Sequence, residues 1–117
     1  MFTKSSERES RLMIEGVRLK SLAWGKHTLL TEVRLDKGSV VPIHDHPQEQ
    51  TGYLVSGRLE FDIGGELVVA EPGDSWSLPG DQVHGAKALE DCLVIEVFSP
   101  VREDYLPQDA AIGDGRK

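Results

Sequence analysis

The sequence lacks the features that mark several large classes of protein. It contains one cysteine, Cys92, which lies in an apolar run, so a disulfide framework is excluded and a buried thiol is expected. No apolar stretch approaches the roughly 20 residues of a membrane-spanning helix, and residues 1–11 are polar and charged rather than signal-like. We therefore expect a soluble protein of the reducing cytoplasm that has no membrane partner.

Basic residues are also in the minority. The chain has 13 Lys and Arg against 20 Asp and Glu, which gives a net charge of -7. Binding to a phosphate backbone requires clustered Lys and Arg, so nucleic acid is not an expected partner. A length of 117 residues suffices for one hydrophobic core and one domain.

Helical patterns of ordinary length are absent, whereas short strand patterns recur. Residues 58–63 place Leu59, Phe61 and Ile63 on one face and charges on the other, which is typical of a half-buried strand. Gly64-Gly65 then indicates a tight hairpin turn. Similar strand patterns cover residues 17–23, 28–35, 39–44, 49–56, 66–70, 74–78, 84–88 and 92–98.

Short strands separated by Gly and Pro turns predict an all-β sandwich or barrel. Residues 1–10 and 108–117 show no periodicity, so we expect flexible tails on either side of a single domain at 11–107.

A group of histidines suggests a metal site. His44 and His46 are two residues apart, so on one strand their rings would share a face, and Gln50 and His84 offer further ligands. Each histidine alone could be an exposed or a hydrogen-bonded core residue. Three of the four histidines fall in these two segments, however, and we expect one divalent ion, Zn, Ni, Fe or Mn.

The spacing around these residues resembles the two motifs of the cupin family. The first motif is matched by Gly38, His44-Asp45-His46, Gln50 and Gly57, with Gln50 where Glu is usual. The second is matched by Gly73 and by Pro79 to His84, with Asp81 replacing the usual Gly and Ala88 the usual Asn. The resemblance implies a cupin-type jelly-roll barrel whose metal ligands are His44, His46, Gln50 and His84.

Two residues compete for the fourth ligand position. Glu49 offers the commoner ligand type, a carboxylate, whereas the motif spacing favours Gln50. Three neutral imidazoles and a neutral amide would leave the charge of the ion uncompensated. Such an ion is a strong Lewis acid for an anionic oxygen substrate.

Glu96 is the only charged residue between Asp91 and Arg102, and the strand around it is apolar on both faces. A buried carboxylate there requires a metal, a partner or a catalytic role. The alternative is an exposed Glu at an edge of the barrel. The protonation state of Glu96 is left open, because burial would raise its pKa and a nearby cation would lower it.

Longer phrases resemble the KdgF-type cupins of pectin and alginate breakdown, above all residues 97–106, and also residues 46–50, 53–61 and 63–66. The resemblance implies an isomerase-type enzyme that converts 4,5-unsaturated monouronates, the products of polysaccharide lyases, to linear keto-uronates. It implies a catalytic role for Glu96, where the family has Asp, and roles in catalysis or substrate binding for Arg102 and Phe98.

Other interpretations stay open at this point. Arg102 could be an ordinary surface charge. A metal-dependent cupin dioxygenase would use similar ligands with a redox-active ion, and a non-catalytic sugar-binding or sensory cupin would keep the pocket without the acid. Apolar outer strands on a small barrel also lead us to expect a homodimer.

Overall fold

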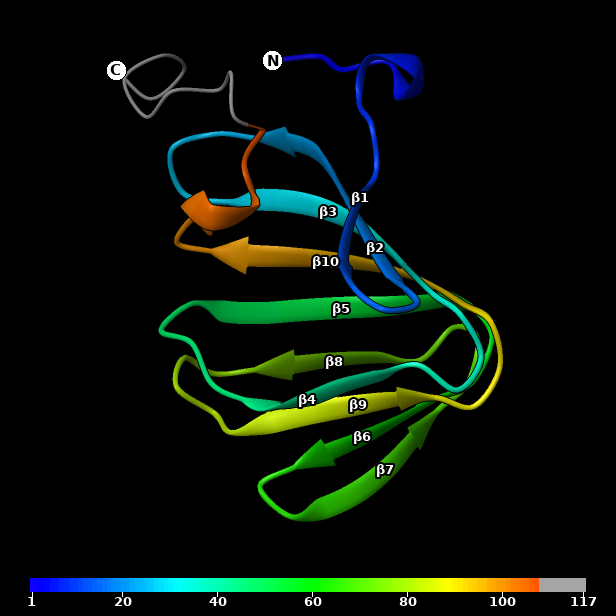
Figure 1. Ribbon diagram of the computed structural model, residues 1–117. Coiled ribbons are helices and arrows are strands. Elements are labelled where there is room, and N and C mark those ends of the chain that lie inside the picture. Colours follow the sequence, from blue (N-terminus) through cyan, green and yellow to red (C-terminus); the bar gives the residue numbers. More distant parts are fainter. Residues whose placement is uncertain (108–117) are drawn as a thin grey trace.

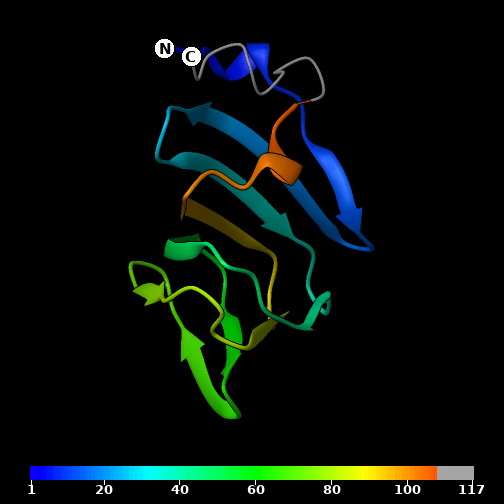
Figure 2. The same cartoon turned by 90° about the vertical axis from the view of Figure 1, so that its left-hand side faces the viewer.

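The protein folds as two antiparallel sheets that curl around a shared interior. The computed structural model describes residues 1–107; the predicted tail at 108–117 lies outside the described residues. Figure 1 and Figure 2 show the β6–β7 hairpin at one end of the molecule and the short helices η1 (Ser5–Glu7) and η2 (Glu103–Tyr105) at the other. The strands are β1 (Arg11–Ile14), β2 (Val17–Trp24), β3 (Leu29–Leu35), β4 (Val40–His44), β5 (Glu49–Ser56), β6 (Leu59–Ile63), β7 (Glu66–Ala70), β8 (Ser75–Leu78), β9 (His84–Ala88) and β10 (Cys92–Ser99).

The strand order is that of a jelly roll. One sheet has the order β1-β2-β3-β10-β5-β8 and the other β4-β9-β6-β7. The β6–β7 turn follows the sequence prediction: Ile63 pairs with Glu66, and Gly64 and Gly65 both have the positive φ that a two-residue hairpin turn needs. The all-β, single-domain prediction is confirmed.

The predicted strands are observed within one residue at either end. The prediction missed β1, a four-residue strand that pairs with β2 at the edge of the larger sheet. Within residues 1–107, η1 and η2 are the only helical segments, and no helix there is long and apolar enough to cross a membrane. The first ten residues contain η1 and place the Arg8 guanidinium over the Trp24 ring.

The inner faces of both sheets form the core. Alternation along β10 turns Val94, Glu96 and Phe98 inward, so a carboxylate lies on the same face as two buried apolar residues. Phe98 belongs to a second cluster with Leu29, Val101 and Leu106, which ties η2 and its flanks to the open end of the barrel. This arrangement brings the strand that carries Glu96 and the segment that carries Arg102 to one cavity.

Candidate metal centre and active-site pocket

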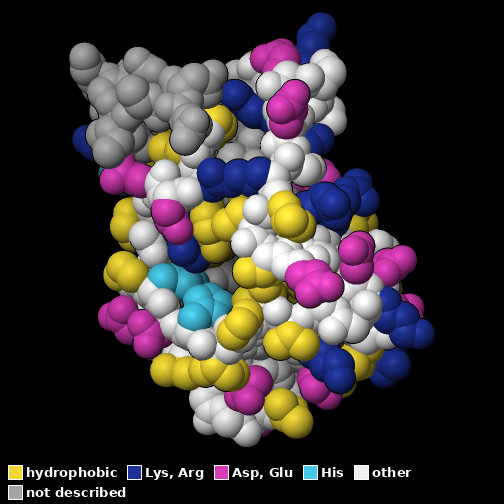
Figure 3. Space-filling view, in the orientation of Figure 1, with side chains coloured by type: hydrophobic (Ala, Val, Ile, Leu, Met, Phe, Trp, Pro, Cys, Tyr) yellow, Lys and Arg dark blue, Asp and Glu magenta, His cyan; other side chains and the backbone are white. Residues whose placement is uncertain are grey.

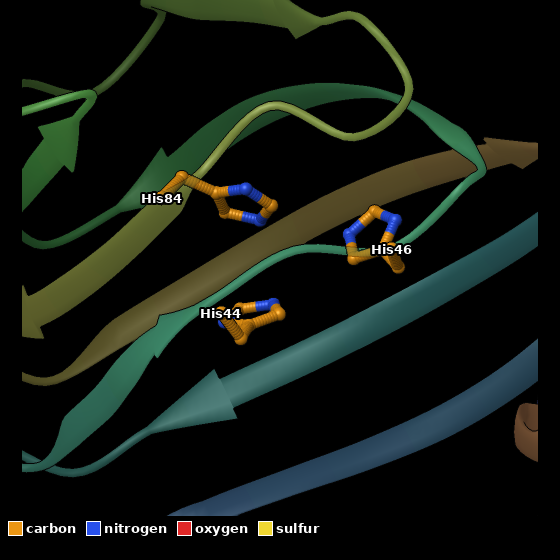
Figure 4. A group of neighbouring side chains, drawn as sticks. All are labelled: His44, His46 and His84. Atoms are coloured by element: carbon orange, nitrogen blue, oxygen red, sulfur yellow. The ribbon is translucent and has the colours of Figure 1, made fainter.

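Three histidine side chains converge inside the barrel (Figure 4). His44 ends β4, His46 lies in the loop that follows, and His84 begins β9 directly opposite His44 in the register. One ring nitrogen from each residue lies within 4.8 Å of the others. The two-residue spacing predicts that the rings of His44 and His46 lie on the same side of the chain. His46 lies past the end of β4, yet its ring still joins the His44 ring in the cluster.

The hydrogen bonds of the rings leave ligand nitrogens free. His44 Nδ1 lies 2.8 Å from the Pro42 carbonyl and His84 Nδ1 lies 2.7 Å from the Gln82 carbonyl, so both nitrogens carry the proton and donate it. The Nε2 atoms of both rings then keep a lone pair, as in many metal-binding histidines. His84 Nε2 is buried and has no hydrogen-bond partner in the described part of the chain. This arrangement fits a metal ion.

Gln50 completes the cluster from β5. Its side chain is 6% exposed, and its Oε1 lies 3.0 Å from His46 Nε2. Two ligand atoms bound to one ion at about 2.1 Å and at right angles are about 3.0 Å apart, so this spacing suits a shared ion. Glu49 is exposed on the opposite face of the strand. In the structure the Gln50 side chain lies against His46, whereas the Glu49 side chain lies on the face away from the histidines.

Glu96 lies next to Gln50 and faces the cavity. Gln50 Nε2 donates a hydrogen bond to Glu96 Oε2, and Trp76 Nε1 donates a hydrogen bond of 3.4 Å to the same oxygen. Burial raises the pKa of the Glu96 carboxyl, while the two hydrogen bonds and the charge of Arg102 act in the opposite direction. Glu96 is therefore not the exposed edge residue of the alternative interpretation.

The cavity that these groups share has a volume of about 360 Å³. Most of its wall is apolar, from residues such as Val33, Leu59 and Phe61. Figure 3 shows histidine side chains reaching the surface beside a hollow, close to basic and hydrophobic side chains. The polar side chains that line the cavity are few: His44, Gln50, His84, Glu96, Arg102 and Tyr105. Such a pocket orients a small ligand through a handful of contacts.

Arg102 and Tyr105 form one wall of the cavity. The Arg102 guanidinium lies 3.9 Å from the centre of the Tyr105 ring and donates to Asp104 Oδ2 at 2.8 Å. Ser21 Oγ donates to the Tyr105 carbonyl, which holds this segment on β2. Arg102 is 14% exposed and faces the pocket, so it is not an ordinary surface charge.

Burial and nearby positive charge favour the neutral imidazoles of His46 and His84. Burial lowers the pKa of His46 and of His84 below the ordinary value of 6.5. The charge of Arg102 and the neighbouring histidines lower both pKa values further, although the hydrogen bonds to Gln50 and to the Gln82 carbonyl oppose this. Neutral rings are the form that binds a metal.

Three further residues shape the site and were not singled out from the sequence. Trp76 contacts Glu96, Tyr105 lines the cavity, and Gly52 lies beneath the Trp76 indole. A glycine within a strand marks a place where another group approaches the backbone closely, so Gly52 offered a signal. Trp76 and Tyr105 offered no such signal, because tryptophan and tyrosine are also common in hydrophobic cores.

Comparisons with known proteins show the family of the chain. Residues 31–98 match the cupin domain family. The pectin degradation protein KdgF of Dickeya dadantii (strain 3937) is 30% identical over 94 residues, which span 79% of this chain and 86% of that protein.

Two solved structures share the whole fold. KdgF from Halomonas sp. has a TM-score of 0.84 at 36% identity and covers 91% of this chain and 100% of its own. An RmlC-like cupin from Shewanella frigidimarina has a TM-score of 0.85 at 28% identity and covers 90% and 95%. The chain resembles KdgF over most of its length, and it belongs to the cupin family as a small single-domain cupin.

Proposed function

We propose that this protein is a metal-dependent, isomerase-type enzyme that converts 4,5-unsaturated monouronates to linear keto-uronates. The observation that carries the proposal is the Glu96 carboxylate, held beside the histidine cluster and facing the cavity. The similarity to two KdgF proteins, one named for pectin degradation, supports the substrate class.

The donor set suits one divalent ion. One ring nitrogen each of His44, His46 and His84 together with Gln50 Oε1 would hold it, and Zn, Ni, Fe and Mn all accept such nitrogen and oxygen ligands. When bound, the ion supplies a Lewis acid that polarises substrate oxygens.

The reaction moves one proton within the substrate. An unsaturated uronate in its ring form carries a hydroxyl at the anomeric carbon and a double bond between C4 and C5, with the ring oxygen on C5. Removal of the hydroxyl proton and cleavage of the bond between the anomeric carbon and the ring oxygen give an aldehyde and an enolate. Delivery of the same proton to C4 then converts the enolate to a ketone, so no atom is gained or lost.

A single carboxylate can serve both steps. Glu96 would accept the proton of the anomeric hydroxyl and return it to C4, and the raised pKa that burial gives its carboxyl makes it a stronger base than an exposed Glu. Arg102 would bind the substrate carboxylate through the donors that Asp104 leaves free. Phe98 and Tyr105 would provide the apolar wall against the sugar ring.

The direct test is an assay on lyase products. Metal-loaded protein with 4,5-unsaturated galacturonate, or with the corresponding alginate-derived monouronate, should accelerate loss of the double-bond absorbance over many turnovers. Oxygen and nicotinamide cofactors should not be consumed. Because ring opening also occurs unaided, the reference is buffer without protein.

Two matched variants sharpen the assay. Glu96→Gln should keep the metal and lower kcat by roughly two powers of ten or more, because it cannot accept a proton. Glu66→Gln, at an exposed position of β7, should behave like the parent. If both uronates react with the protein no faster than in buffer, the enzyme assignment is rejected. Oxygen uptake during the reaction would point to a dioxygenase.

A further inference from the structure

Glu96, Gly52 and Trp76 lie opposite one another on three adjacent strands. Glu96 of β10 pairs with Gly52 of β5, and Gly52 pairs with Trp76 of β8. All three positions face the barrel interior, as Gln50 and Leu78 do two residues further along β5 and β8. The Trp76 side chain therefore has to cross one whole strand to reach Glu96.

Gly52 makes that crossing possible. A Cβ atom at position 52 would overlap Nε1 and Cε2 of the Trp76 indole. The indole thus lies against the Gly52 backbone and also packs against the Phe61 ring, at 4.6 Å between centroids. Its one polar atom, Nε1, points at Glu96 Oε2.

Both hydrogen bonds to Glu96 reach the same oxygen. Gln50 Nε2 and Trp76 Nε1 both donate to Oε2, and within residues 1–107 no hydrogen bond reaches Oε1. A carboxylate held this way keeps its rotamer and presents the other oxygen to the cavity. The amide of Gln50 is fixed by the same contact, because its donor end faces Glu96 and its oxygen faces His46.

We propose that Trp76 is a positioning residue for the reaction, and that with Gly52 it locks Glu96 so that Oε1 is the oxygen that exchanges protons with the substrate. The proposal rests on the proposed function for its catalytic consequence. The hydrogen bond itself can be measured without turnover.

The kinetic test removes the donor or displaces it. Trp76→Phe keeps an aromatic ring against Phe61 but has no N–H, and Gly52→Ala keeps the indole but pushes it off β5. In both variants kcat should fall about tenfold, KM should stay within about twofold, and metal content should not change. Trp24→Phe and Gly25→Ala are the matched controls and should behave like the parent, since nothing lies within 4 Å of a Cβ at position 25.

The second measurement follows the two indole N–H signals by NMR in protein labelled with nitrogen-15. The chain has two tryptophans, so Trp24→Phe assigns both signals. Glu96→Leu removes the acceptor and should move the Trp76 indole proton upfield, while the Trp24 signal stays in place. An unmoved Trp76 signal, or a folded Trp76→Phe variant with the parent kcat, would overturn the proposal. Absence of turnover in the parent would reject the proposed function alone.

Discussion

At the scale of single residues, Gln50 explains a departure from the usual cupin motif. The family's usual Glu would place a second carboxylate against Glu96, whereas the amide of Gln50 offers a donor to Glu96 and an oxygen to the histidines. The sequence suggested only that a neutral ligand strengthens the Lewis acid. The structure adds a second reason, because two adjacent carboxylates could not both ionise at low cost.

The substitution Gln50→Glu tests this reading. A carboxylate at position 50 can still bind a divalent ion, so metal content should be retained. It cannot donate to Glu96, and repulsion between the two carboxylates should leave one of them protonated at neutral pH. We expect kcat to fall at least about tenfold, a difference of about 1.4 kcal/mol in activation free energy. Elemental analysis and steady-state kinetics check both points, and a parent-like kcat would contradict the explanation.

Individual residues also show which parts of the site could be predicted from the sequence and which could not. The side chains of Glu49 and Gln50 point to opposite faces of β5, and Gln50 is the one on the buried face. The sequence left these directions open, because the preceding loop at 45–48 obscures where the alternation of the strand begins. The inward direction of Glu96 was equally undecided, since both faces of β10 are apolar. Trp76 could not be identified at all, because its contact with Glu96 depends on two strand pairings distant in sequence.

At the scale of elements, strand register assembles the site. His44 and His84 meet because β4 and β9 pair, although 40 residues separate them in the chain. Alternation along each strand was readable in the sequence, so nine of the ten strands were predicted. β1 was missed because four residues after a charged segment give too little pattern, and the pairing with β2 includes an irregularity between Leu12 and Ile14.

The segment that carries Arg102 gives a prediction at this scale. Arg102 is held by the Tyr105 ring beneath it and by Asp104 beside it, so its planar head is oriented before substrate binds. Arg102→Lys keeps the charge but loses the stacking and the paired donors. We expect KM for the uronate to rise about tenfold with a smaller change in kcat, because binding of the carboxylate is weakened in ground and transition states alike.

The matched control for Arg102 is Arg34→Lys. Arg34 lies exposed on β3 and pairs with Glu32 at the surface, where an ion pair contributes little. Its KM should equal that of the parent. If Arg102→Lys lowers kcat and leaves KM unchanged, Arg102 acts in the chemical step instead of in substrate binding.

At the scale of the whole molecule, the charge of the protein opposes its proposed substrate. The chain carries a net charge of -7 and a uronate is an anion. Salt screens charges beyond about 8 Å, so the groups at the cavity decide binding. Arg102 is positive there, and a bound divalent ion would add to that charge.

Metal binding and the stability of the fold should both depend on pH. In the metal-free protein the pKa values of His46 and His84 lie below 6.5, so between 6.5 and those lower values the unfolded chain binds more protons than the folded one. The free energy of unfolding should therefore decrease as pH falls through this range. A divalent ion binds only neutral rings, and at a concentration 100 times its Kd it should add about 2.7 kcal/mol of stability.

Calorimetry of metal-loaded and metal-free protein between about pH 5 and 8 checks this linkage. We expect the ion to raise Tm by several degrees at the upper end, and the difference to shrink as pH falls through the lowered pKa values of His46 and His84, because protons then compete for the same nitrogens. His84→Ala should abolish the difference at every pH. His27→Ala removes the one histidine outside the cluster and should preserve it. An effect of metal on Tm that survives in His84→Ala, or that grows as pH falls, would show that the ion binds elsewhere.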